Sequence, residues 1–135
     1  MPDGDVRLLS RIYATRRISY NAFGNIVEES YLDERGNVPT IARKTITYDL
    51  FNREIERQFF DGSGELVDGT GGVAVVRIEY DASGRLVAER CLDRNGKLAT
   101  QHGVGWALHT VTYAERERKD AYTDANGRSV TPPPP

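Results

Sequence analysis

The sequence predicts an all-β protein, an antiparallel meander of about eight strands formed by four tandem hairpin repeats. Three observations favour this fold class. A tyrosine followed by a turn sequence recurs about every 30 residues. An Asp-x-x-Gly sequence follows each tyrosine, and apolar and polar residues alternate in the stretch that precedes the tyrosine. A curved or solenoid-like sheet is the expected arrangement, and a two-layer β-sandwich is the alternative.

The spacing of the two turn sequences defines the repeating unit. The tyrosines are Tyr20, Tyr48, Tyr80 and Tyr113. The Asp-x-x-Gly sequences begin at Asp33, Asp61, Asp93 and Asp124. The aspartate follows its tyrosine at one constant distance in the first three units and two residues sooner in the fourth. The expected single domain covers residues 12–130, with units at about 12–40, 41–69, 70–100 and 101–130. A lead-in at 1–11 precedes it. A proline-rich tail at 131–135 follows it and is either the start of a linker or a native end.

Each unit opens with a strand that ends at its tyrosine. In residues 73–80, the side chains of Ala74, Val76, Ile78 and Tyr80 fall on one face, because successive strand residues point to opposite faces. The other face is mainly polar beside the tyrosines. One buried and one solvated face are typical of an antiparallel sheet.

Both turn sequences have a local chemical explanation. The first-position Asp accepts hydrogen bonds from the backbone ahead of it, and the fourth-position Gly supplies the positive φ that a hairpin bulge needs. We therefore expect positive φ at Gly84 and Gly96. Asn52 replaces Gly in the second unit, and Asn also tolerates this conformation. The shorter fourth unit predicts a tighter turn at Glu115 and Arg116.

Return strands are expected at residues 25–32, 53–60 and 85–92. Aligned on one another, they place Glu29, Arg57 and Glu89 in one row. If neighbouring units pair in register, Arg57 lies between two glutamates in a cross-strand charge ladder. The segment 7–17 precedes Tyr20 as residues 73–80 precede Tyr80, which favours a strand there, with a short helix in its first half as the alternative.

The recurring pattern resembles tandem repeats found in large bacterial multidomain proteins. It also loosely resembles the YD repeats of RHS-type proteins, and residues 80–87 (Tyr-Asp-Ala-Ser-Gly-Arg-Leu-Val) are the closest match to a YD unit. The resemblance covers roughly residues 12 to 130. It implies a scaffold of β-rich repeats that forms a shell, stalk or docking surface beside a separate effector domain.

Composition and charge exclude several classes of partner. The formal net charge is −2, from 18 basic and 20 acidic residues, so no nucleic-acid partner is expected. No apolar run approaches the roughly 20 residues that cross a bilayer, and the first six residues do not resemble a secretory signal, so no membrane partner is expected. The single cysteine, Cys91, favours a reducing compartment, which predicts a cytoplasmic protein unless a longer parent protein is secreted.

Few side chains are candidates for catalysis. Cys91 occupies the return-strand position of Tyr31 and Phe59, so a buried structural cysteine is expected rather than a nucleophile. His102 and His109 are the only histidines, and no motif marks an orienting group, oxyanion donors or a zinc-ligand spacing. We therefore predict that the protein is not an enzyme.

The aspartate-rich turns raise the question of calcium. The turn at Asp61, with Asp68 beyond it, is the best candidate, but the 12-residue loop of an EF-hand is missing. Turn formation accounts for every one of these aspartates. No metal site and no cofactor are predicted.

An apolar patch is the one predicted interaction surface. Alternation places Trp106 and Leu108 on the face opposite Tyr113, and Val73 and Val75 are their counterparts in the third unit. These four residues are expected to form an apolar patch on a polar face. Such a patch either lies under another part of the protein or marks a partner surface.

These observations favour a non-catalytic interaction or scaffold module of a larger bacterial multidomain protein. The expected partner is another protein or a second copy of the chain, bound through the sheet face or the edge strands. Two alternatives are an accessory β-repeat domain of a toxin-like or enzymatic protein, with its chemistry elsewhere, and a small-ligand-binding β domain.

Overall fold

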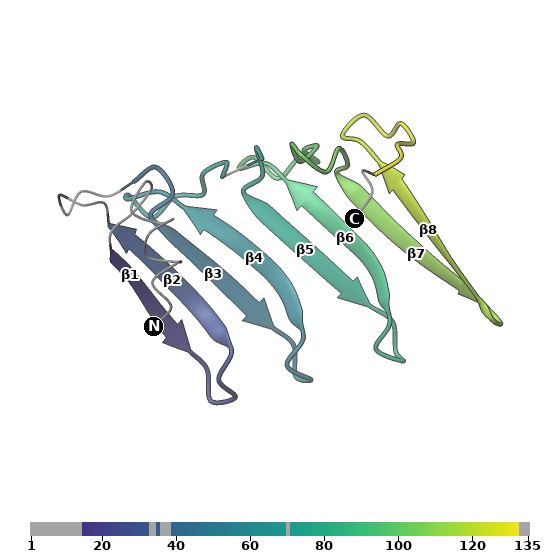
Figure 1. The fold of residues 1–135 in the computed structure, drawn as a ribbon, viewed down its shortest axis with the longest axis horizontal. Helices are drawn as coiled ribbons and strands as arrows, with labels where there is room; N and C mark the ends of the chain where they lie inside the picture. Colours follow the sequence, from purple (N-terminus) through teal and green to yellow (C-terminus); the bar gives the residue numbers. More distant parts are fainter. Residues whose placement is uncertain (1–14, 33–34, 36–38, 70, 133–135) are drawn as a thin grey trace.

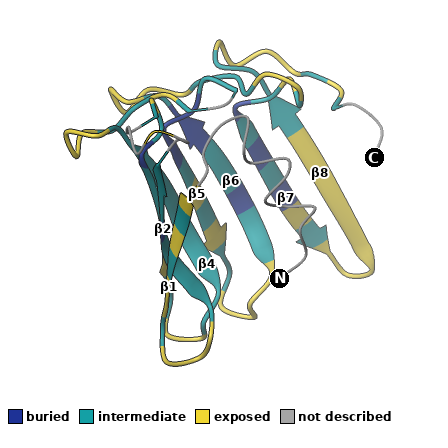
Figure 2. Cartoon of the chain, turned by 60° about the vertical axis from the view of Figure 1, so that its left-hand side comes forward, coloured by how far each residue is buried: buried dark blue, intermediate teal, exposed yellow. Residues whose placement is uncertain are grey.

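The described residues of the protein form a single antiparallel sheet of eight strands whose spatial order follows the chain order (Figure 1). A computed structural model describes residues 15–32, 35, 39–69 and 71–132, and these residues contain no helix. The sheet is curved and does not close into a barrel (Figures 1 and 2). The predicted all-β meander is therefore confirmed, and the described residues form one layer rather than the two of a sandwich.

The strands form four consecutive hairpins. They are β1 (Thr15–Tyr20), β2 (Ile26–Leu32), β3 (Arg43–Tyr48), β4 (Glu54–Phe60), β5 (Val75–Tyr80), β6 (Leu86–Leu92), β7 (Leu108–Ala114) and β8 (Glu117–Thr123). The return strands β2, β4 and β6 end where the sequence predicts and begin one residue later. The strand predicted before Tyr20 is confirmed from Thr15 onward, and the alternative of a helix in the first half of 7–17 lies outside the described residues.

Six turns share one set of hydrogen bonds, and the turn at Asp81 illustrates it. Oδ1 of Asp81 accepts the backbone N–H groups of Ser83 and Arg85, both at 2.9 Å. The N–H of Gly84 donates to the carbonyl of Asp81 at 2.9 Å, and φ of Gly84 is +85°. The other five turns begin at Asn21, Asp49, Asp61, Asp93 and Asp124. The predicted turn at Asp33 lies outside the described residues.

The fourth hairpin has the tighter turn that its shorter sequence predicts. Only Glu115 and Arg116 separate β7 from β8, and φ of Glu115 is +48°. The positive φ expected at Gly96 is +83°, and Asn52, which replaces Gly, has a φ of +65°. Turn chemistry therefore sets the hairpin boundaries.

A tyrosine connects each hairpin to the one before it. The hydroxyl of Tyr48 donates to the carbonyl of Ile26 at 2.7 Å. The same bond joins Tyr80 to Glu54 at 3.0 Å and Tyr113 to Leu86 at 2.8 Å. In each case the acceptor is the first residue of the preceding return strand, and we call this bond the tyrosine latch.

The core lies towards the loop edge of the third and fourth hairpins. Ala74 and Ala107 are fully buried, each one residue before its strand begins, and Ala42 has the corresponding position in the second hairpin. Buried residues concentrate in β6 and β7, whereas β8 is exposed along most of its length (Figure 2). The best-packed part of the chain thus lies in its C-terminal half, next to the exposed edge strand β8.

The predicted charge ladder is wrong. The meander places the first strand of the next hairpin, which we call an outward strand, between successive return strands. Glu29 instead pairs with Arg16 at 2.8 Å and with Lys44 on β3 at 3.1 Å. Burial raises the pKa of Glu29, but these cations outweigh it and the net shift is downward. Arg57 pairs at 2.9 Å with Glu54 on its own strand.

Candidate functional site

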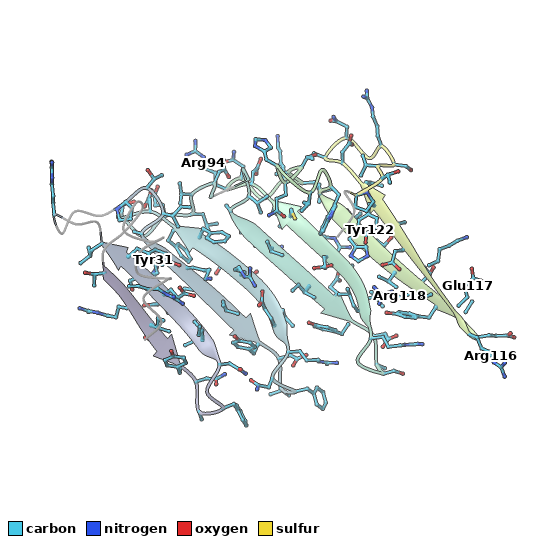
Figure 3. The ribbon with its side chains drawn as sticks, in the orientation of Figure 1. Tyr31, Arg94, Arg116, Glu117, Arg118 and Tyr122 are labelled. Carbon is cyan, nitrogen blue, oxygen red and sulfur yellow. The ribbon has the colours of Figure 1, made fainter. Side chains whose placement is uncertain are left out.

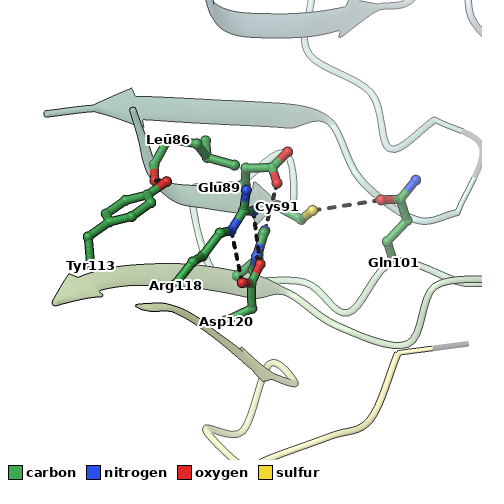
Figure 4. A network of polar contacts seen from close by, with 8 residues as sticks. Leu86, Glu89, Cys91, Gln101, Tyr113, Arg118 and Asp120 are labelled. Atoms are coloured by element: carbon green, nitrogen blue, oxygen red, sulfur yellow. Dashed lines mark hydrogen bonds and ion pairs between the residues drawn. The ribbon is translucent and has the colours of Figure 1, made fainter. Parts of the chain in front are cut away.

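Cys91 (Figure 4) and His109 lie on the neighbouring strands β6 and β7, and they are the two side chains most able to support catalysis. Cys91 is 1% exposed, and its Sγ lies 3.8 Å from Oε1 of Gln101. Burial, reinforced by the negative charge of Glu89, raises the pKa of the Cys91 thiol to about 11. The thiol is therefore protonated at neutral pH and is not a prepared nucleophile.

His109 is held between two carboxylates. Its Nδ1 lies 2.7 Å from Oε1 of Glu89 on β6, and its Nε2 lies 2.8 Å from Oδ2 of Asp120 on β8. Its ring also stacks on Tyr122 at a centroid distance of 4.3 Å. Each ring nitrogen of His109 thus lies within hydrogen-bonding distance of a carboxylate on a neighbouring strand. The group joins β6, β7 and β8.

Arg118 completes this polar group from the exposed side. It donates to both carboxylate oxygens of Asp120, at 3.0 Å each, and these hydrogen bonds hold the pKa of Asp120 below its usual range. In Figure 4, dashed lines join Arg118 to Asp120, and Glu89 lies close to them. The arrangement connects neighbouring strands, and among the described residues the hydrogen-bond partners of the histidine ring are carboxylates rather than a nucleophile.

The remaining predicted chemical candidates also have structural contacts. The backbone N–H of His102 donates to the carbonyl of Gly71 at 3.0 Å, joining two loops. Asp61 uses Oδ1 to hold the N–H groups of Ser63 and Glu65, as turn formation requires. Within the described part of the chain, no group of three or more His, Cys, Asp or Glu side chains is placed to hold a metal ion.

The four residues of the predicted patch do not line one accessible surface. Val73 and Val75 are only 2% and 3% exposed, and Val75 belongs to a buried cluster with Leu92. Trp106 lies 5.7 Å from the ring of His109, on the face opposite to the one that alternation predicts. The reason is that residue 107 lies in a bend, so the alternation of the strand begins only at Leu108, which is half-buried.

A different apolar surface lies at the turns of the first two hairpins. Its members, which we call the tip cluster, are Phe23, Leu50 and Phe51. Leu50 is 99% exposed, and the two phenylalanines are each 77% exposed. All three occupy hairpin turns, at the ends of the strands opposite to the long loops (Figure 1).

The two turns that carry the tip cluster are neighbours. Nδ2 of Asn21 lies 3.5 Å from Oδ1 of Asn52 across the gap between them. An open depression lies beside this contact and is lined by Phe23, Ile46 and Tyr48, among others. Two adjacent hairpin tips therefore combine exposed aromatic and aliphatic side chains with a shallow, partly apolar recess.

Sequence reasoning identified these turns but not their surface. The signal was available, because the corresponding turn positions of the third hairpin hold Ala82 and Ser83. A large apolar residue at such a position has no core to join and must face solvent. Leu50 and Phe51 are therefore recognisable from the turn assignment alone.

The chain matches no known family model and no curated protein. In the described part of the chain, no helix is long and apolar enough to cross a membrane.

Proposed function

We propose that the chain is a non-catalytic interaction module of a larger bacterial multidomain protein, built from tandem hairpin units that resemble YD repeats. Its partner is another protein, and the tip cluster is the surface that binds it. The observation that carries this proposal is the exposure of Phe23, Leu50 and Phe51 on two adjacent turns.

The energetics of the tip cluster support a binding role. The turns are fixed by backbone N–H groups that donate to the side-chain oxygens of Asn21 and Asp49, so the three side chains are presented on a rigid frame. Little ordering entropy is then lost on binding, and a partner that covers them gains the full burial of large apolar groups. Aromatic side chains in such positions are common anchors of protein interfaces.

The side chains that could support an enzymatic alternative are already engaged elsewhere. The Cys91 thiol is buried with a raised pKa, and both nitrogens of His109 face carboxylates. These contacts favour a structural role for both residues. The proposal therefore places function on the exposed turns rather than in the sheet interior.

A site-specific photocrosslinker tests the proposal. Benzoylphenylalanine replaces Phe51 in one sample and Ser83, the corresponding position of the third hairpin, in a matched control. We expect a specific protein to be captured at position 51 and not at position 83. The purified captured protein should then bind the wild-type chain and lose at least tenfold in affinity with Phe23→Ser/Leu50→Ser/Phe51→Ser, since each lost anchor costs of order 1 kcal/mol.

A second control separates the tip cluster from general hydrophobicity. Leu98→Ser removes another exposed leucine, which is 36% exposed and follows the second turn of the third unit. This variant should bind as the wild type does. Equal binding of the triple variant and the wild type would refute the proposed surface.

A further inference from the structure

We infer that β8 of one copy pairs with β1 of a second copy, so that the sheet continues head to tail from molecule to molecule. The inference deepens the proposed interaction function, on which it rests, by naming a second copy of the chain as a partner at a surface separate from the tip cluster. In the described part of the chain, β1 and β8 each have one neighbouring strand. The edge of such a strand carries backbone groups that can accept another strand.

The three internal junctions between hairpins define the geometry of this contact. Each joins a return strand to the next outward strand in the same register. The central pairs are Glu29 with Lys44, Arg57 with Val76, and Glu89 with His109. Continuing the series, Asp120 of β8 takes the return-strand position and Arg16 of β1 takes the outward-strand position.

The correspondence is fixed inside the hairpins themselves. Ile18 lies opposite Glu29 in the first hairpin, and Val111 lies opposite Asp120 in the fourth. The first hairpin already contains the arrangement that the junction needs, because Glu29 accepts both Arg16 of its own hairpin and Lys44 of the next. Asp120 takes the position of Glu29 but already contacts both His109 and Arg118 of its own hairpin, so in the continued sheet Arg16 of the next molecule shares this carboxylate with Arg118.

The tyrosine latch points to the same partner. Tyr48, Tyr80 and Tyr113 each donate to the preceding return strand, whereas Tyr20 begins the series and is 58% exposed. The internal acceptors are the first residues of β2, β4 and β6. Each of these acceptors lies opposite the tyrosine of its own hairpin, and Arg118 lies opposite Tyr113. The corresponding acceptor for Tyr20 of the next copy is therefore the carbonyl of Arg118.

An arginine–aromatic contact accompanies two of the latches. Arg53 lies over the ring of Tyr80 at 4.6 Å, and Arg85 lies over Tyr113 at 4.3 Å. Both arginines immediately precede their return strand. By register, Glu117 takes the position of these arginines in the fourth hairpin, and Arg116 lies one residue closer to the free tip of the β7–β8 hairpin (Figure 3).

One pair in this register opposes association. On the other face, the internal junctions pair Glu28 with Thr45 and Glu56 with Arg77. Continuation brings Lys119 opposite Arg17, and like charges directly opposite one another weaken a strand pair. The wild-type contact is therefore weak, and this pair provides a sharp test.

Sedimentation velocity over a range of protein concentrations measures the association. We expect Lys119→Glu alone and Arg17→Glu alone to tighten it, each by about fivefold, because each replaces repulsion with attraction. The double variant Lys119→Glu/Arg17→Glu restores like charges and should return to the weak association of the wild type. Lys97→Glu, which makes the same charge change in a turn away from both edges, should have no effect.

The size distribution gives an independent criterion. A head-to-tail contact leaves a free β1 and a free β8 on every assembly, so mean size should grow with concentration beyond the dimer. A distribution that stops at the dimer would overturn the inference. So would monomers at every concentration for all variants, or equal behaviour of the Lys119→Glu and double variants.

The tip cluster provides the means to separate the two proposals. The variant Phe23→Ser/Leu50→Ser/Phe51→Ser should self-associate as the wild type does, since its changes lie in turns rather than on the outer edges of β1 and β8. Loss of partner binding without loss of self-association would show that the two surfaces act independently. Absence of self-association together with intact partner binding would overturn only the head-to-tail contact.

Discussion

At the scale of single residues, a few side chains fix the geometry of each hairpin. The turn aspartates and the latch tyrosines act through hydrogen bonds to backbone groups, so their effect depends on position rather than on large buried area. Polar residues are for this reason the most regularly spaced features of the sequence. The stability of the protein should respond more to them than their exposure suggests.

The latch predicts a measurable contribution from a single hydroxyl. Tyr80→Phe removes the donor to the carbonyl of Glu54 and keeps the aromatic ring, so we expect the free energy of unfolding to fall by about 1 kcal/mol. Tyr20→Phe is the matched control, because its hydroxyl makes no latch within the described residues, and it should change stability little. Urea denaturation measures both, and equal effects would contradict the latch.

The turn aspartates predict loss of stability in acid. The pKa values of Asp49, Asp61 and Asp81 are held below the usual range, chiefly by the backbone N–H of Arg53, the hydroxyl of Ser63 and the backbone N–H of Arg85, respectively. A carboxylate whose folded pKa is depressed stabilises the fold above its unfolded pKa of about 3.9. That stability is lost as the pH falls through the lower, folded values.

Replacing these aspartates by asparagine tests the assignment. Asn21 shows that an amide oxygen can accept the same two backbone N–H groups. The variant Asp49→Asn/Asp61→Asn/Asp81→Asn should therefore fold, and its urea midpoint should fall less than that of the wild type below about pH 4. Parallel loss of stability in both proteins would show that other groups control acid unfolding.

The environment of Cys91 predicts that its thiol reacts slowly with thiol reagents in the native state. Burial limits access, and a pKa of about 11 leaves little thiolate at neutral pH. A thiol reagent should label the folded protein slowly and the urea-unfolded protein rapidly. Rapid labelling of the folded protein would instead favour the enzymatic alternative.

At the scale of strands and turns, local chemistry explains what the sequence could predict. Turn positions follow from Asp and Gly, and the return strands follow the turns, so their boundaries are correct to within one residue. Alternation places Trp106 on the wrong face, because the bend at residue 107 interrupts the pattern before β7 begins. A single irregular residue reverses the face of every side chain before it.

Contacts between strands were harder to predict than the strands themselves. Glu89, His109 and Asp120 belong to three successive strands, and their meeting depends on two registers at once. An alignment of the return strands alone also omits the strand that the meander places between them. Knowledge of the strand order is sufficient to correct both errors, but no short motif in the sequence supplies it.

At the scale of the whole molecule, the sheet is a chain of hairpins in which each strand contacts only its sequence neighbours. In such an arrangement the stability is approximately the sum of contributions from each hairpin and from its contacts with its neighbours, so one end of the sheet can unfold without the other. Packing is uneven along the series, since Val73, Cys91 and Ala107 are almost completely buried, whereas most residues of β1 are exposed. The third hairpin and β7 should therefore form the most stable part.

Native-state amide hydrogen exchange measures this gradient. We expect the strongest protection in β5, β6 and β7, where backbone bonds lie beside the buried residues, and the weakest in the edge strands β1 and β8. Exchange measured well below the concentration at which copies associate reports the isolated sheet. Lys119→Glu at high concentration should then slow exchange in β1 and β8 selectively, because a second strand covers each edge. Uniform protection across all eight strands would show instead that the sheet unfolds as one unit and that its hairpins are not independent.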